Sequence, residues 1–292
     1  MSTSNRATKL TKTHKILKKH FKPVSTAERP VLEHLLYACC LSGDTHETAD
    51  EAFAKLQEAY FDWNEVRVTT VSELAEVMSS LSKSAAAASM LKRTLQSVFE
   101  THYSFDLEFL KKENLGKAIK ELEKLDGVGP FALAYVTQNG LGGHAIATCN
   151  GALEVLRILG IITDSEAAQK RVPGMERAIS KSSGVEFSSM LHQLGIDYQA
   201  APFSPRVRGI LLEITPDAKD RFPKRTTKKA VEAKTKKKDK AKSAKPSDKK
   251  KAPEKKATAK KTAKTSTKTS KKSASVTKKK TSSNRLTKKK PR

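Results

Sequence analysis

Apolar residues in the first two thirds of the chain recur three or four positions apart, which is the spacing of one face of an α-helix. The segment from Glu28 to Gly43 shows this most clearly, because a wide apolar stripe begins just after Pro30 and ends before the glycine. The strict alternation typical of β-strands is scarce. The sequence therefore predicts an all-α fold.

Further helices are predicted from the same spacing and from residues that favour helix starts. Thr45 to Trp63 is expected to form one helix, and Ser72 and Ser84 are expected to begin the next two. Segments with similar periodicity follow at 105–110, 115–125, 130–140, 149–159, 164–171, 173–183 and 186–197. The chain is thus expected to form many helices joined by turns.

Charge divides the chain into three parts. The sequence has 57 Lys and Arg against 31 Asp and Glu, a net charge of +26. Residues 224–292 hold 30 of the basic and 4 of the acidic residues, which accounts for the whole excess, and residues 1–22 hold seven basic residues and no acid. We expect a basic N-terminal arm at 1–25, an all-helical domain at 26–223 and a Lys-rich tail at 224–292.

The tail has almost no apolar residue larger than alanine, so it cannot offset its conformational entropy by burial, and we expect it to be disordered. Lysine blocks such as Lys236, Lys237 and Lys238 can follow a phosphate backbone without reading bases. The composition resembles the tails of linker histones. Nucleic acid is the predicted partner, most simply double-stranded DNA, while RNA or a role in solubility or localisation are the alternatives.

Cofactors and membranes are not indicated. Cys39, Cys40 and Cys149 lie in or beside apolar runs rather than in a spaced framework, so neither disulfides nor a metal site is expected. The histidines lack metal-ligand spacing and are expected at helix surfaces or caps. No apolar run approaches about 18 residues, so we expect a cytoplasmic protein, associated with the nucleoid in a bacterium or nuclear in a eukaryote. Oligomeric state is not indicated.

One turn carries more information than the rest. The segment 122–130 places Gly127, Val128 and Gly129 between an apolar helix and a second helix that starts at Pro130. Glycines allow a tight turn and a close approach, and the next helix presents its free amides and positive end. The sequence predicts a helix-hairpin-helix near 122–140, whose amides hold one DNA phosphate without reading sequence.

From about Glu28 to Arg221 the order of features resembles the endonuclease III superfamily of helix-hairpin-helix DNA glycosylases. The resemblance rests on the segments 35–45, 125–136 and 144–161 and covers about two thirds of the chain. It implies two all-helical lobes with a DNA cleft between them. It also implies a protein built for base-excision repair, which binds duplex DNA without sequence preference.

The catalytic positions depart from that family. In the alignment of the segments above, the lysine of the lyase members falls on Phe131 and the aspartate of the active members falls on Cys149. A thiol is mostly neutral at pH 7, so it cannot offset the positive charge that develops on the sugar. Glu154, one helical turn away, is a weak candidate for the missing acid. We therefore expect DNA binding without base excision.

The family's iron-sulfur cysteines are absent from 200–214, so no cluster is expected, and Arg206 and Arg208 there are candidates to face DNA. Two alternatives stay open. The chain is an active, divergent glycosylase whose acid lies elsewhere, for example at Asp126 or Asp197. Otherwise it is an architectural or RNA-associated protein, in which the body is a protein-interaction module and only the tail touches nucleic acid.

Overall fold

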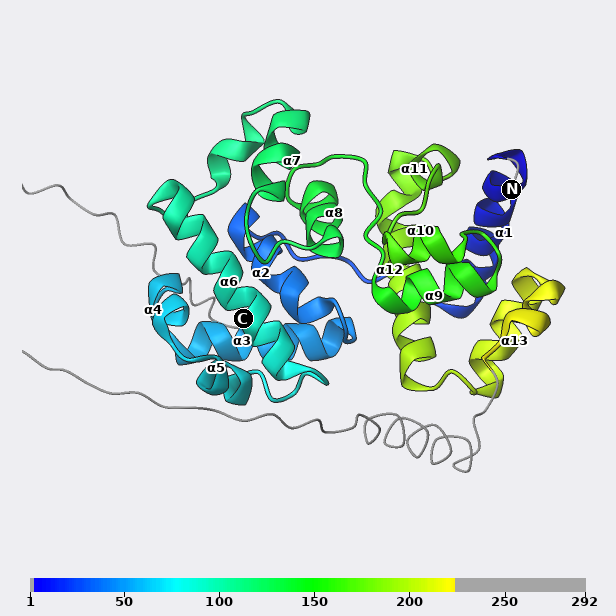
Figure 1. Ribbon diagram of the computed structural model, residues 1–292, viewed down its shortest axis with the longest axis horizontal. Coiled ribbons are helices and arrows are strands. Elements are labelled where there is room, and N and C mark those ends of the chain that lie inside the picture. Colours follow the sequence, from blue (N-terminus) through cyan, green and yellow to red (C-terminus); the bar gives the residue numbers. More distant parts are fainter. Residues whose placement is uncertain (1–2, 224–292) are drawn as a thin grey trace, which may run out of the picture. The chain divides into compact units, whose positions relative to one another are not determined.

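The computed structural model describes residues 3–223, where all regular structure is helical and no strand occurs (Figure 1). The predicted all-α fold is confirmed. No helix among these residues is long and apolar enough to cross a membrane. The predicted tail, with Lys236, Lys237 and Lys238, lies outside the described residues.

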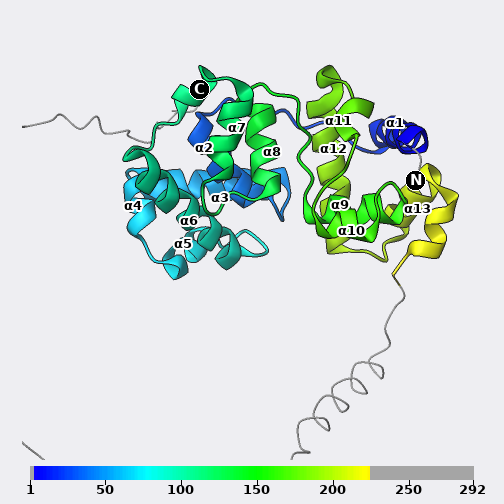
Figure 2. The same ribbon diagram turned by 45° about the horizontal axis from the view of Figure 1, so that its top comes forward.

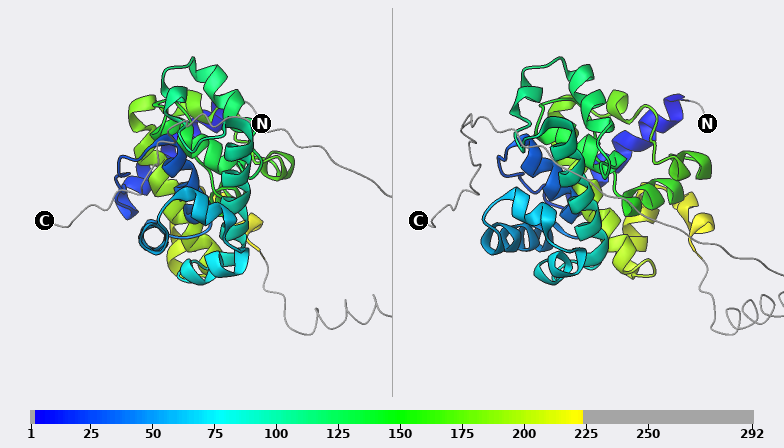
Figure 3. Two further views of the ribbon diagram at one scale, coloured as in Figure 1. Left: turned by 90° about the vertical axis from the view of Figure 1, so that its left-hand side faces the viewer. Right: turned by 60° about the vertical axis from the view of Figure 1, so that its left-hand side comes forward.

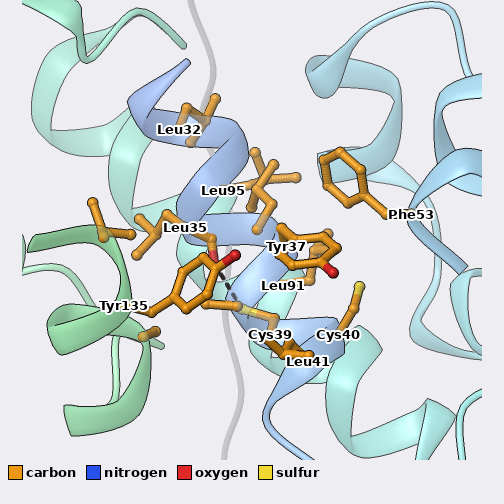
Figure 4. Close-up of a cluster of buried hydrophobic side chains, with 14 of the residues drawn as sticks. Leu32, Leu35, Tyr37, Cys39, Cys40, Leu41, Phe53, Leu91, Leu95 and Tyr135 are labelled. Atoms are coloured by element: carbon orange, nitrogen blue, oxygen red, sulfur yellow. Dashed lines mark hydrogen bonds between the residues drawn. The ribbon is translucent and has the colours of Figure 1, made fainter. Parts of the chain in front are cut away.

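The first hydrophobic core, which we call the first lobe, is built around α2. Nearly every residue of α2 is buried, and Figure 4 shows its side chains between Phe53 of α3, Leu91 and Leu95 of α6, and Tyr135 of α8. The elements of this lobe are α2 (Val31–Leu41), α3 (His46–Ala59), α4 (Trp63–Val68), α5 (Val71–Val77), α6 (Ser84–His102), the 3-10 helix η1 (Glu108–Lys111), α7 (Leu115–Glu123) and α8 (Pro130–Asn139).

The second core, which we call the second lobe, joins both ends of the helical body. Its longest element, α12, packs along α9, and α1 lies beside α11, α12 and α13 (Figures 1 and 2). The elements are α1 (Thr3–His20), α9 (Asn150–Ile158), α10 (Asp164–Ala168), α11 (Met175–Ala178), α12 (Lys181–Ala200), α13 (Pro205–Ile214) and the 3-10 helix η2 (Pro216–Arg221).

The N-terminal residues, expected to form a separate basic arm, are instead part of the second lobe. Helix α1 buries Leu10 and Leu17 in the second core, and Phe21, the residue after the helix, is buried there too. The helix contacts α11, α12 and α13 (Figures 1 and 3). The guanidinium of Arg6 donates to both carboxylate oxygens of Glu166, at 3.0 and 3.1 Å. The many lysines of this segment made its narrow apolar stripe hard to recognise in the sequence. The stripe is nevertheless long enough for the helix to pack on the second core.

Several predicted helix boundaries were wrong, and capping hydrogen bonds explain two of them. The predicted helix from Thr45 to Trp63 is broken, because Tyr60 is extended and the Asp62 side chain accepts from the Glu65 amide at the start of α4. Helix α5 is capped by Thr70 rather than Ser72, in a reciprocal capping box with Glu73. Capping hydrogen bonds here interrupt an apolar periodicity that continues across the break.

Helices α9 and α12 cross with their backbones in contact. A Cβ atom added to Gly151 would lie 2.1 Å from the carbonyl oxygen of Gly195, and one added to Gly195 would lie 2.5 Å from the amide nitrogen of Ala152. Neither contact can be relieved by a side-chain rotation, because both neighbours are backbone atoms. This crossing therefore requires glycine on both helices.

We predict that Gly151→Ala lowers the free energy of unfolding by roughly 3 kcal/mol or more, because the added methyl group forces α9 and α12 apart. Chemical denaturation measures it. Gly209→Ala is the control: a Cβ there meets nothing within 4 Å, so helix propensity should raise the stability by about 0.5 to 1 kcal/mol. Equal effects of the two changes would contradict the packing argument.

Candidate nucleic-acid interface

The predicted hairpin is present, and its first glycine is required by the fold. The turn between α7 and α8 places Gly127 at a φ of 90°, in a region that side chains rarely adopt. A Cβ at Gly127 would also lie 2.8 Å from the backbone nitrogen of Thr94 and 2.9 Å from the carbonyl oxygen of Met90. The hairpin turn is thus pressed against the backbone of α6.

The second glycine is different, because the fold does not require it. Gly129 has a φ of −83°, which any residue adopts, and an added Cβ would meet nothing within 4 Å. The missing side chain leaves open surface at the start of α8. Such a gap is of use to a partner that approaches the backbone closely.

The amides of the hairpin are only partly free. The Val128 amide donates to the carbonyl oxygen of Leu125 at 3.3 Å, so it closes the turn and does not face outward. Helix α8 has no side-chain cap at Gly129 and has Pro130 at its first position. The positive end of α8 and the amides of its first turn are therefore the groups left to hold an anion.

Opposite charges flank this surface. The Asp126 carboxylate accepts from the Gly127 amide at 2.9 Å and is 73% exposed on its side chain. Arg93 of α6, also more than half exposed, lies 3.9 Å from it. Since the pair is exposed, its strength is small, and the Arg93 guanidinium is free to turn toward an approaching phosphate.

Phe131, the second residue of α8, lies between the lobes. Its ring stacks on Tyr135 at a centroid distance of 6.1 Å and on His192 of α12 at 5.7 Å, with interplanar angles of 28° and 29°. It packs against both hydrophobic cores. The aromatic side chain at this position thus fills the junction with apolar surface.

Cys149, which the resemblance aligns with the family's aspartate, is the N-cap of α9. Its Sγ accepts from the Ala152 amide at 3.4 Å. The residue is only 2% exposed, and burial raises the pKa of its thiol. A Cβ on Gly195 would lie 3.0 Å from this sulfur, so α12 covers it closely. The side chain is therefore neutral and shielded from solvent.

The alternative acids have different surroundings. Glu154 is nearly half exposed and paired with Arg157, with a shortest distance of 2.8 Å. Asp126 belongs to the hairpin surface described above. Asp197 of α12 lies 3.7 Å from Arg206 and lines a cavity together with His46 and His192. The cavity that Asp197 faces lies at the junction of the lobes.

Two cavities meet at the histidine pair His46 and His192. One, bordered by Phe131 and Tyr135, holds about 20 Å³, the space of about one water molecule. The other holds about 360 Å³ and is lined largely by polar side chains. Their shared wall is the edge-to-face contact of the two imidazole rings, with centroids 5.2 Å apart.

His192 and His34 are buried, against the expectation of surface or capping positions. The Nε2 atom of His192 lies 2.9 Å from the carbonyl oxygen of Asp44, and since a carbonyl only accepts, this nitrogen carries the proton. The bond links α12 of the second lobe to the loop after α2. This hydrogen bond could not be predicted from the sequence, because a histidine on an apolar helix face does not indicate which distant carbonyl oxygen it will contact.

The arginines of α13 differ in exposure. Arg206 has a side chain 63% exposed and lies over the ring of Phe21 at 5.5 Å. Arg208 is half-buried, with its guanidinium near the rings of Phe203 and Phe222 at 5.0 and 4.8 Å. Arg206 is therefore available to a partner, whereas Arg208 is engaged in packing the C-terminal end of the body.

Comparison with solved structures agrees with this architecture. A non-covalent endonuclease III–DNA complex is 18% identical, with a TM-score of 0.54 over 77% of this chain and 100% of that one. A trapped covalent endonuclease III–DNA intermediate is 17% identical, with a TM-score of 0.50 over 76% and 100%. The chain has the helix-hairpin-helix DNA glycosylase fold. A thermostable thymine-DNA glycosylase also aligns, at 18% identity, a TM-score of 0.48 and coverage of 70% and 89%.

Comparisons of sequence alone find no relative of this chain. No family model matches it. No curated protein matches it either. The chain thus shares the glycosylase fold without a detectable match in sequence.

We predict an acid-sensitive stability that originates in the buried histidines. Burial lowers the pKa of His34 and of His192 from 6.5 to about 4. As pH falls from 6.5 toward 4, these histidines become protonated in the unfolded chain but stay neutral in the folded chain. The free energy of unfolding is therefore highest above this pH window and falls within it. The free energy of unfolding should fall by roughly 1 to 3 kcal/mol for each histidine across this range.

Chemical denaturation at a series of pH values measures this loss. His34→Gln removes one of the two titrating groups and should make the dependence between pH 6.5 and 4.5 shallower. An unchanged slope in that variant would show that other groups cause the loss.

Proposed function

We propose that the chain binds duplex DNA through its sugar–phosphate backbone and does not excise bases. The observation that carries this proposal is the contrast between an open hairpin at Gly129 and a covered, neutral Cys149. The first feature suits an anionic partner. The second removes the charge on which sugar chemistry depends.

The binding half of the proposal rests on the start of α8. An uncapped helix end attracts a phosphate through its free amides and its dipole. The fold leaves room for a side chain at Gly129, so its absence leaves this surface open to a partner outside the chain. Contacts of this kind orient a protein on the duplex without selecting a sequence.

The non-catalytic half rests on electrostatics. Glycosidic cleavage develops positive charge on the sugar, which a fixed carboxylate has to stabilise. At the aligned position a buried thiol with a raised pKa offers no such charge. Phe131 cannot form a Schiff base, and its ring fills the junction by stacking on His192.

The tail extends the proposal. Its charge equals that of the whole chain, and if it neutralises about ten phosphates, log K should fall with log salt at a slope of about −9. We propose that the tail tethers the body to DNA at low salt. The corresponding location is the nucleoid of a bacterium or the nucleus of a eukaryote.

The second candidate function is that of an active, divergent glycosylase. One observation favours it: Asp197 lines the cavity of about 360 Å³ at the lobe junction, next to His46 and His192. A carboxylate there could serve a base held in that cavity. Against it, Asp197 has Arg206 3.7 Å away and comes from α12 rather than from the start of α9.

We predict that Gly129→Ala keeps the fold and weakens duplex binding by roughly three- to tenfold, because its methyl group occupies the surface that a phosphate approaches. Gly127→Ala should instead lower the free energy of unfolding by roughly 2 kcal/mol or more, through backbone strain and contact with α6. Fluorescence anisotropy with a short duplex and denaturant unfolding separate the two effects. Unchanged affinity in Gly129→Ala would make the hairpin purely structural.

A chain that ends at Pro223 retains both cores as the structure describes them for residues 3–223. We predict that it binds duplex DNA at low salt with a much shallower salt slope than the full chain, because only body contacts remain. Equilibrium titrations at several salt concentrations measure both slopes. No detectable affinity of this body at low salt would mean that the tail alone binds nucleic acid.

Incubation of the full chain with duplexes carrying an abasic site or damaged bases should give neither strand breaks nor free base above background. The physical reason is the absent charge at Cys149. Gel electrophoresis and chromatography of released bases measure it. Turnover abolished by Asp197→Asn or by Glu154→Gln would establish the second candidate function instead.

A further inference from the structure

The N-terminal helix presents a line of cations to solvent. Helix α1 turns Leu10 and Leu17 into the second core, and Phe21, which follows the helix, is buried there too. On the opposite side Lys12, Lys15 and Lys19 of α1 are exposed, as is Lys22 just after its end. Their spacing of three, four and three residues puts them on one helical face. From Lys12 to Lys22 this line runs about 15 Å along the helix axis.

Other basic residues of α1 are used by the fold. Arg6 binds both oxygens of Glu166. The Lys9 ammonium donates to the carbonyl oxygens of Leu159 and Gly160, at 3.5 and 3.2 Å, which caps the end of α9. These contacts hold α1 in one orientation, so the exposed line is fixed on the body.

Along the exposed line, some lysines are paired and others are not. Lys19 lies 2.8 Å from Glu213, and the neighbouring Lys18 lies 2.9 Å from Glu186. Within residues 3–223 no carboxylate lies within 4.0 Å of Lys12, Lys15 or Lys22. These three therefore have no acidic partner in the described body.

Arg206 of α13 extends the line. Its guanidinium lies over the ring of Phe21, the residue that follows α1, and it lines the same cavity as Lys22. The Lys22 backbone is held by the Gln193 side chain, which donates to its carbonyl oxygen at 2.8 Å. We call the exposed set Lys12, Lys15, Lys22 and Arg206 the α1 basic face.

The opposite sign of charge gathers in the first lobe. Residues 44–79, which include α3, α4 and α5, contain nine acidic and two basic side chains. Two of these acids, Glu47 and Asp50, line the same cavity as Lys22 and Arg206. A polyanion is repelled from the acidic surface and is attracted to the α1 basic face. Residues 1–223 as a whole hold 27 basic and 27 acidic side chains, and this overall neutrality conceals the separation.

A membrane surface is a poor partner for this helix. Basic amphipathic helices bind bilayers by inserting their apolar side. In α1 that side is already buried, with Leu10 and Leu17 at 0% exposure. Only the cationic side is available, which suits a regular array of phosphates.

We infer that the α1 basic face is a second contact surface for the phosphate backbone of duplex DNA, on the lobe that does not carry the hairpin. This inference rests on the proposed function and adds a binding element to it. Each of its cations that meets a phosphate releases counterions and contributes about 0.9 to the salt slope.

The test uses the full chain with Lys12, Lys15 and Lys22 all changed to Gln. The slope of log K against log salt for a duplex should become shallower by about 2 to 3, with weaker binding at a fixed salt concentration. The matched control changes Lys83, Lys112 and Lys170 to Gln, which removes the same charge from other exposed positions. Equal changes in both variants would overturn the inference, since net charge alone would then explain them.

A second measurement reports on contact directly. Amine acylation of the unaltered chain, mapped by mass spectrometry with and without duplex, should show protection of Lys12, Lys15 and Lys22 but not of Lys83. Absence of protection overturns the inference, as does protection by RNA and not by DNA. Loss of binding in Gly129→Ala with an unaffected lysine variant would leave the hairpin proposal standing and remove only this inference, and the reverse outcome would remove only the hairpin.

Discussion

The crossing of α9 and α12 is the contact on which the rest of the second lobe and its junction with the first depend. At Gly151 and Gly195 the two backbones touch, and no side chain other than hydrogen fits. This approach buries Cys149 at the start of α9 and fixes the axis of α12. From that axis His192 reaches the Asp44 carbonyl and the ring of Phe131. One backbone contact thus determines both the covered thiol and the closed junction.

The hairpin and the lobe junction of the glycosylase fold differ in how far this chain keeps their functional groups. The hairpin is intact: Gly127 allows the turn to pack against the backbone of α6, and Gly129 leaves the start of α8 open. At the lobe junction, by contrast, stacked rings and a neutral sulfur stand where the resemblance implies a lysine and an acid. Since backbone binding and sugar chemistry use separate groups, the first can persist without the second. This separation is the physical basis of the proposed function.

Charged residues are distributed unevenly over the chain. The tail carries the net excess, the first lobe is acidic around α3 to α5, and α1 is cationic on its outer side. The large charge of the tail adds to the affinity for polyanions, while charges on the folded surface determine how a duplex lies on it. Both kinds are present in one chain, which is consistent with a protein that stays on DNA and holds it in a defined way.

Sequence alone determined the helical class, most helix positions and the hairpin, because these depend on local periodicity and on glycines between helices. The resemblance also aligns Phe131 and Cys149 with the two catalytic positions of the family. Only the tertiary structure decided that residues 3–20 join the second core, that Arg208 packs against aromatic rings and that the Val128 amide closes the turn. It also brought His46, His192 and Asp197 around one cavity. These facts depend on contacts between residues far apart in the chain, and spacing along a sequence carries no information about which distant surfaces meet.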